Sequence, residues 1–201
     1  MKLHTTPTSP YGRIARIVLI EKGLEDRIPV IPAQTRKPDS PYYKINASGR
    51  VPCLELDDGT GLEESALVSA YLDQLDGEPM FTTPDGKSGW EARRLEAMAR
   101  SMLDGISLWG REFLYRDENE RSATIIAHEE ARANRLADAF ESEADHPALT
   151  GQLNMAQITL ACTFDGRENK PEGFDWRAGR PKLAALIDRL GERPSIASTR
   201  P

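Results

Sequence analysis

The most informative segment of the sequence is Asn46-Ala47-Ser48-Gly49-Arg50-Val51-Pro52-Cys53-Leu54-Glu55-Leu56-Asp57-Asp58-Gly59, and Leu62-Glu63-Glu64-Ser65-Ala66-Leu67 follows soon after it. In order, it predicts a turn, a Val-Pro step, a short apolar strand, a tight hairpin, a second strand and a helix. The Asp58-Gly59 pair favours the hairpin because glycine adopts positive φ without steric cost. The helix is expected to open at Ser65, whose hydroxyl can accept a hydrogen bond from the first free N–H groups.

Strand-like and helix-like segments alternate on the N-terminal side of this stretch. Residues 2–5 form a short strand, and 10–22 read as a helix that stops at Gly23. Residues 28–31 form a strand whose Pro29 predicts an edge position in the sheet. With the helix over 65–75, the first 76 residues have the pattern of an α/β domain.

The sequence pattern changes after residue 76. Residues 77–86 are rich in Pro, Gly and Thr and predict a linker, and residues 87–201 show helical periods without strand alternation. Four helices are expected, over 90–114, 123–144, 155–164 and 183–190. The third is apolar nearly all round, which marks a helix at the centre of a bundle. At its start, Asn154 can cap the helix and Gln157 can reach back to the cap. The fold class is therefore α/β followed by all-α.

Composition narrows the function classes. The 201 residues are 39% hydrophobic and 29% charged, as in ordinary globular proteins. Since 26 Lys and Arg stand against 32 Asp and Glu, the net charge of −6 gives no general attraction to nucleic acid or to anionic membranes. No apolar run reaches the roughly 20 residues of a membrane span, and no secretory signal is recognisable.

The residues that often carry metal or redox chemistry are scattered. Cys53 and Cys162 each lie inside an apolar run, which predicts two buried thiols rather than a disulfide and favours a reducing cytoplasm. His4, His128 and His146 show neither metal-ligand spacing nor a triad pattern, so no metal is expected.

The order of loop, Val-Pro step, hairpin and Glu-Ser pair resembles the glutathione-binding half of the glutathione S-transferases. The similarity extends over nearly the whole chain and is strongest over 1–76. It implies a thioredoxin-like glutathione-binding domain over 1–76, the linker over 77–86 and an all-helical domain over 87–201. It also implies a cis Val51-Pro52 bond and a homodimer in which each first domain faces the partner's helical domain.

The resemblance locates the catalytic hydroxyl between the first strand and the first helix. Such an enzyme must stabilise the glutathione thiolate, and a hydroxyl donor at a helix N-terminus does so. Ser9, the expected N-cap before Pro10, is the leading candidate, as in bacterial members with a Ser-Pro helix start. Thr8 and Tyr11 remain alternatives. No Cys stands here, which disfavours a mixed-disulfide mechanism, and Cys53 is expected to be structural.

The remaining glutathione contacts also follow from the resemblance. The main chain of Val51, turned by Pro52, meets the cysteinyl part, while Glu64 and Ser65 hold the γ-glutamyl ammonium and carboxylate. Either Arg50 or Lys37 can pair with the glycine carboxylate.

The protein is therefore expected to be a cytoplasmic glutathione transferase that acts in detoxification. Glutathione would be its co-substrate and a small electrophile its second substrate. The electrophile is expected near one region of the first long helix, with Met102, Leu103, Trp109, Phe113 and Tyr115 as candidates. Two alternatives stay open: glutathione-dependent reduction of disulfides or peroxides, and a non-catalytic interaction module of the same fold.

Overall fold

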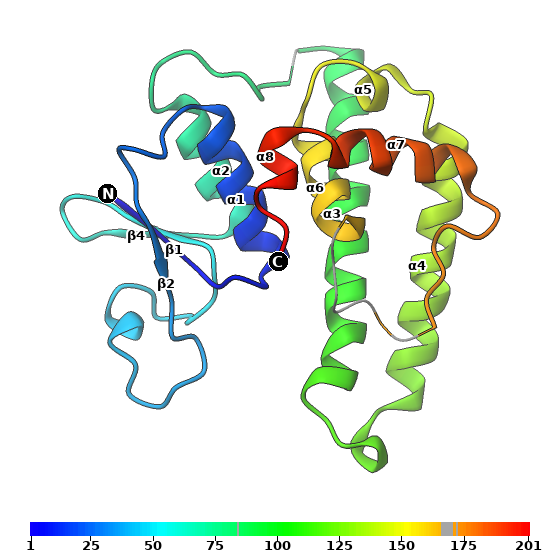
Figure 1. The fold of residues 1–201 in the computed structure, drawn as a ribbon, viewed down its shortest axis with the longest axis horizontal. Helices are drawn as coiled ribbons and strands as arrows, with labels where there is room; N and C mark the ends of the chain where they lie inside the picture. The colour runs from blue at the N-terminus through cyan, green and yellow to red at the C-terminus, as the bar shows by residue number, and fades with distance from the viewer. Residues whose placement is uncertain (84, 166–170, 172) are drawn as a thin grey trace. The chain divides into compact units, whose positions relative to one another are not determined.

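The structure, a computed structural model, describes residues 1–83, 85–165, 171 and 173–201. They form two compact units, the first made of Met1–Thr82 with Ala197–Pro201 and the second of Thr83–Ile196 (Figure 1). The predicted linker includes Pro84, and the predicted helical domain includes residues 166–170 and 172. These positions lie outside the described residues.

The first unit contains a four-stranded mixed sheet in the order β2-β1-β3-β4. The strands are β1 (Lys2–Thr5), β2 (Val30–Pro32), β3 (Cys53–Glu55) and β4 (Gly61–Glu63). Only the β1–β2 pair is parallel. The predicted edge position of β2 is confirmed. This strand begins two residues later than expected because the Ile28 amide is used in a turn, where it donates to Leu24 at 3.0 Å.

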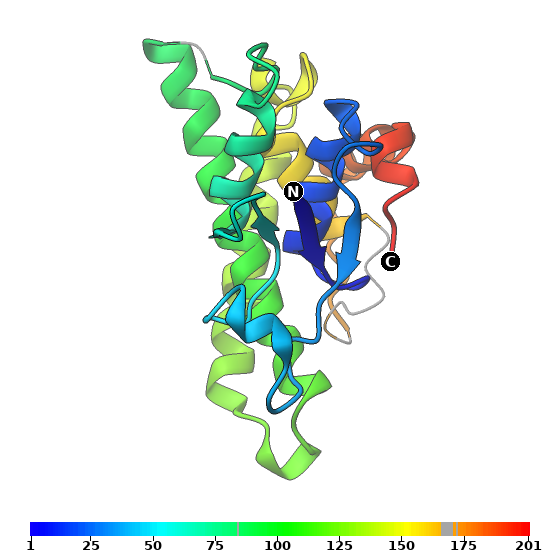
Figure 2. The ribbon, with the colours of Figure 1, turned by 90° about the vertical axis from the view of Figure 1, so that its left-hand side faces the viewer.

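Two helices, α1 (Pro10–Glu21) and α2 (Ser65–Gln74), pack against each other and cover one face of the sheet (Figure 2). Leu3 and Leu54, which pair across β1 and β3, are fully buried. Gly23 terminates α1 as predicted: it follows the C-cap Lys22, its φ is 62°, and the next amide, of Leu24, donates back to Leu19 at 3.0 Å. The fold of this unit is thioredoxin-like.

A 3₁₀ helix that the sequence did not predict, η1 (Pro41–Lys44), packs near His4 of β1. Its Tyr42 ring lies 5.5 Å from the His4 ring, centroid to centroid. The chain after η1 comes close to β4, since a β-carbon on Gly61 would meet the Ile45 carbonyl oxygen at 2.3 Å. Glycine at this position therefore permits the loop before β3 to lie against the sheet.

The described part of the second unit contains helices and no strand. They are α3 (Lys87–Leu114), η2 (Glu118–Glu120), α4 (Ala123–Glu143), α5 (Pro147–Thr150), α6 (Met155–Phe164), α7 (Pro181–Gly191) and α8 (Pro194–Ala197), which runs into the C-terminal residues. The short η2, α5 and α8 were not predicted. Helix α6 packs on α3 and α7, and every residue from Ala156 to Phe164 is buried, as its apolar sequence indicated.

Asn154 caps α6, with its Oδ1 accepting from the amides of Ala156 and Gln157. The expected reach of Gln157 back to the cap is wrong. Its Nε2 donates instead to the carbonyls of Ala148 and Gly151, at 3.3 and 3.4 Å, because the turn after α5 brings these acceptors within range.

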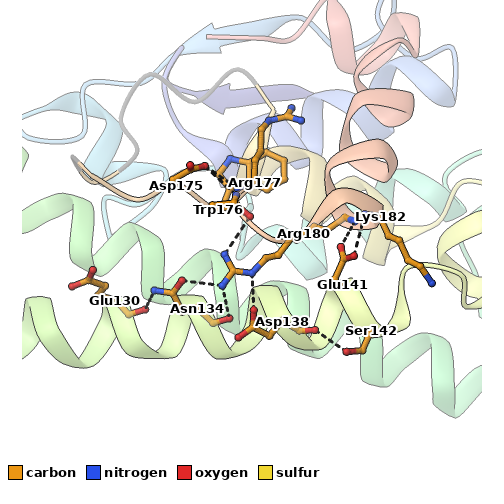
Figure 3. A network of polar contacts seen from close by, with 12 residues as sticks. Glu130, Asn134, Asp138, Glu141, Ser142, Asp175, Trp176, Arg177, Arg180 and Lys182 are labelled. Atoms are coloured by element: carbon orange, nitrogen blue, oxygen red, sulfur yellow. Dashed lines mark hydrogen bonds and ion pairs between the residues drawn. The ribbon is translucent and has the colours of Figure 1, made fainter.

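Polar contacts fix the start of α7 on α4 (Figure 3). Arg180 Nε donates to Asp138 at 2.7 Å, and Arg180 Nη2 donates to the Asn134 side chain at 3.0 Å. The Glu141 carboxylate accepts from the amides of Lys182 and Leu183, two of the free donors of the first turn of α7. None of the helices in the described ranges is long and apolar enough to cross a membrane.

Candidate functional site

The strand register brings three chain segments to one end of the sheet. Cys53, the first residue of β3, pairs with His4 near the end of β1 and with Glu63 at the end of β4. The segments that continue from this end therefore lie beside one another: the loop from Thr5 to Ser9, the Val51-Pro52 step and the Glu64-Ser65 pair. These are the segments from which the sequence predicted a glutathione site.

Ser9 is the N-cap of α1, as predicted, with Pro10 in the first helical position. Its Oγ accepts a hydrogen bond from the Gly12 amide at 3.1 Å. This bond uses a lone pair of the hydroxyl, and its proton makes no hydrogen bond to another described residue. Ser9 is half-buried at the positive end of the helix dipole, where a hydroxyl can donate to an anion. Of the two alternatives, Thr8 is exposed and Tyr11 is half-buried.

The Val51-Pro52 peptide bond is cis, which confirms the prediction. Pro52 is buried and Val51 is partly exposed. The preceding turn is closed by Asn46, whose Oδ1 accepts from the Ser48 amide at 3.0 Å.

The N-cap of α2 is Glu64, and the expectation that Ser65 caps this helix is wrong. Glu64 has φ 82°, a left-handed conformation that is uncommon outside glycine, and its Oε2 accepts from the Ala66 amide at 3.0 Å. Ser65 is the first helical residue, 1% exposed, and its Oγ donates to Glu64 Oε1 at 3.1 Å. The unusual backbone of Glu64 turns the chain so that its own carboxylate, rather than the serine hydroxyl, caps the helix.

The two basic candidates lie on the surface. Arg50 and Lys37 are exposed, and neither side chain makes an ion pair with another described residue. Both are therefore available to an anionic ligand, and the contacts within the chain do not distinguish between them.

Cys53 is a buried free thiol, as predicted. Burial raises the pKa of this thiol to about 11. The thiol therefore stays protonated near neutral pH and is a poor nucleophile. Cys162 is also a buried, reduced thiol. Among the described residues no group of three or more His, Cys, Asp or Glu could hold a metal ion.

The five candidates for electrophile contacts, four on α3 and Tyr115 directly after it, differ in burial. Met102, Leu103 and Trp109 belong to the core of the helical unit, with at most 2% of their surface exposed. Phe113 is half-buried, with the Arg121 guanidinium 4.7 Å above its ring, and Tyr115 is 54% exposed.

Sequence reasoning missed Tyr42 as part of this region. Tyr42 donates to the carbonyl of Arg50, next to the Val51-Pro52 step. The only signal for Tyr42 in the sequence was an aromatic residue in a loop rich in polar residues, and this pattern does not by itself indicate a binding site.

The chain is similar to known proteins in sequence and in fold. Residues 8–75 match the family model of the glutathione S-transferase N-terminal domain. The GST-like protein YibF of Escherichia coli K12 is 28% identical over 203 residues, covering 100% of this chain and 98% of YibF. A glutathione transferase family member from Pseudomonas fluorescens Pf-5, solved with bound glutathione, is 30% identical with a TM-score of 0.88, covering 100% of this chain and 98% of that one. A glutathione S-transferase from Methylobacillus flagellatus KT, also solved with glutathione, is 25% identical with a TM-score of 0.88 and the same coverage.

The protein therefore has a thioredoxin-like domain and a helical region, and its fold is similar to that of the two glutathione-bound structures. The chain belongs to the glutathione S-transferase family.

Proposed function

We propose that this protein is a glutathione transferase that binds glutathione and stabilises its thiolate for attack on a small electrophile. The observation that carries the proposal is the meeting of Ser9, Val51-Pro52 and Glu64-Ser65 at one end of the sheet. The relatives solved with bound glutathione support the choice of ligand.

The proposed chemistry needs a thiolate at neutral pH. An ordinary cysteine thiol has a pKa of about 8.5, and an anion is favoured by a hydrogen-bond donor and by a helix N-terminus. The Ser9 hydroxyl is held by the Gly12 amide at 3.1 Å and supplies the donor, while α1 supplies the helix N-terminus. The thiolate sulfur then bonds to the electrophilic carbon, and the leaving group departs with its electron pair.

Binding is assigned by charge. Glu64 pairs with the γ-glutamyl ammonium, and Ser65, at the N-terminus of α2, offers its amide to the neighbouring carboxylate while its hydroxyl holds Glu64 Oε1 at 3.1 Å. The main chain of Val51 forms hydrogen bonds with the cysteinyl part of glutathione. The glycine carboxylate pairs with Arg50 or Lys37, which are exposed and free of ion pairs with other described residues.

Calorimetric titration with glutathione, up to about 10 mM, tests the binding part of the proposal, because a ligand well above its Kd gives measurable heat and stabilisation. Absence of binding would favour the non-catalytic interaction module.

Rates with chlorodinitrobenzene and with hydroxyethyl disulfide then test the chemistry. Higher activity with chlorodinitrobenzene is expected for conjugation. Higher activity with the disulfide would favour reduction that uses bound glutathione as the thiol, since the buried Cys53 is a poor nucleophile.

We further propose that the protein is a cytoplasmic homodimer. Two buried cysteines in the reduced state, Cys53 and Cys162, suit a reducing compartment. Leu67 on α2 is 51% exposed and Trp90 on α3 is 67% exposed, and a symmetric partner would remove such apolar surface from water.

A further inference from the structure

The main-chain carbonyl of Arg50 accepts hydrogen bonds from two buried side chains. The Tyr42 hydroxyl donates to it, and Asn46 Nδ2 donates to it at 2.9 Å. Tyr42 and Asn46 are each 4% exposed. Asn46 Nδ2 also lies 3.3 Å from the Tyr42 oxygen, so the three groups form one buried cluster.

The same loop is held at a second point. The Ser48 hydroxyl bonds to the Glu63 carboxylate and accepts from the Arg50 amide at 3.2 Å. Glu63 ends β4 and immediately precedes Glu64. Both the amide and the carbonyl of Arg50 are therefore fixed by side chains, although the side chain of Arg50 itself is exposed.

Arg50 directly precedes Val51. The Arg50 carbonyl and the Val51 amide belong to one planar peptide unit, so a donor that fixes the carbonyl also fixes the direction of the Val51 N–H. We propose that Tyr42 and Asn46 are positioning residues for glutathione: by holding the Arg50 carbonyl, they aim the Val51 main chain at the cysteinyl part of the ligand. This inference rests on the proposed function.

Tyr42 is suited to this task over a wide pH range. Burial raises the pKa of its hydroxyl to about 12, so the group remains a hydrogen-bond donor at neutral and moderately alkaline pH. Its ring packs on His4, and Tyr42→Phe would keep that contact while removing the donor.

The test compares Tyr42→Phe and Asn46→Asp with wild type. In the second variant the Nδ2 donor is replaced by an acceptor. A matched control is Tyr43→Phe. Tyr43 is the neighbour of Tyr42 in η1, and its hydroxyl donates to the Thr35 carbonyl at 3.1 Å rather than to the Arg50 carbonyl. Glutathione affinity is measured by calorimetry, KM and kcat are measured with chlorodinitrobenzene, and amide hydrogen exchange is followed at Arg50 and Val51 without ligand.

Tyr42→Phe should raise the Kd and the KM for glutathione about 3- to 10-fold, the effect of losing one hydrogen bond. Asn46→Asp also places an acceptor against the Arg50 carbonyl, so it should raise both at least as much. The kcat at saturating glutathione should stay close to wild type, and exchange of the Arg50 amide, which donates to Ser48 Oγ at 3.2 Å, should accelerate as the loop loses its other anchor. Tyr43→Phe should leave the Kd unchanged. If Asn46→Asp does not fold, the milder variant Tyr42→Phe tests the positioning role by itself.

An unchanged Kd in Tyr42→Phe, or an equal increase in Tyr43→Phe, would overturn the positioning role while wild type still binds glutathione. If wild type itself fails to bind, the proposed function fails, and the positioning role fails with it.

Discussion

Gly12 lies so close to Thr5 that a β-carbon on Gly12 would come within 1.7 Å of Thr5 Oγ1 and 3.0 Å of Thr5 Cβ. Thr5 ends β1 and is buried, while Gly12 lies in the first turn of α1 and donates its amide to Ser9. The absence of a side chain at Gly12 therefore allows the helix start, with Ser9, to be seated on the end of the strand.

Gly12→Ala should lower the free energy of unfolding by about 1–3 kcal/mol, because the extra methyl group overpacks this contact. It should also slow conjugation by displacing Ser9. Urea denaturation and steady-state rates measure both effects. Adding Thr5→Ala removes the nearest atom and should recover part of the stability, and a double mutant no better than Gly12→Ala alone would contradict this account.

Ser9→Ala should keep glutathione affinity but lower kcat about 10- to 1000-fold, because it removes a donor to the developing thiolate. It also removes a helix cap worth about 0.5–2 kcal/mol. The matched control is Ser122→Ala, which removes the cap of α4, a bond of 3.3 Å from the Ile125 amide. Activity that falls equally in both variants would indicate a purely structural role for Ser9.

Glu64→Gly should separate binding from stability. Glycine accepts the positive φ of 82° without the strain of about 1–3 kcal/mol that a non-glycine residue has there, which offsets the lost cap. The loss of a charged hydrogen-bonding partner should raise the Kd for glutathione about 10-fold or more. Thermal denaturation should therefore change little while calorimetry shows weakened binding, and unchanged binding would exclude Glu64 from the site.

Glu55 should make stability depend on acidic pH. Its Oε2 lies 2.7 Å from His4 Nε2, and this hydrogen bond holds the pKa of the Glu55 carboxyl below its usual range. A carboxyl whose folded pKa is depressed contributes stability above its unfolded pKa of about 4.3, and this contribution is lost as pH falls through the folded pKa.

Urea denaturation from neutral pH to about pH 3 measures this contribution, because the stability is lost at pH values below the unfolded pKa of about 4.3. Glu55→Gln should lose stability at neutral pH and show a shallower acid decline than wild type. The control Glu25→Gln replaces an exposed carboxylate in the turn after α1 and should keep the wild-type profile. Parallel declines in wild type and Glu55→Gln would contradict the assignment.

Light scattering at micromolar concentration should give twice the mass of one chain. Leu67→Lys should produce a monomer, because a charge on the exposed apolar face of α2 would have to be desolvated in the dimer. Leu114→Lys is the control, since Leu114 is similarly exposed, at 50% against 51%. A single-chain mass for wild type would exclude a stable dimer.

The sequence by itself determined the elements whose signals are local. Apolar periodicity located α1, α4 and α7, composition located α3, and a continuous apolar run located α6, while Pro10 after Ser9 identified the first helix cap. A helix period or a cap depends on residues within one turn of one another, so a single chain reveals it. The cis Val51-Pro52 bond was predicted from a family motif, which is also a local pattern.

How these elements come together as a site depends on contacts between distant parts of the chain. The pairing of Cys53 with both His4 and Glu63 brings three loops together, and strand register depends on contacts between residues far apart in sequence. The left-handed backbone of Glu64, which makes it rather than Ser65 the cap of α2, is a non-glycine conformation that the surrounding structure has to maintain. The bonds from Tyr42 and Asn46 to Arg50 likewise depend on burial, because a polar side chain acquires a defined partner when water is excluded from around it.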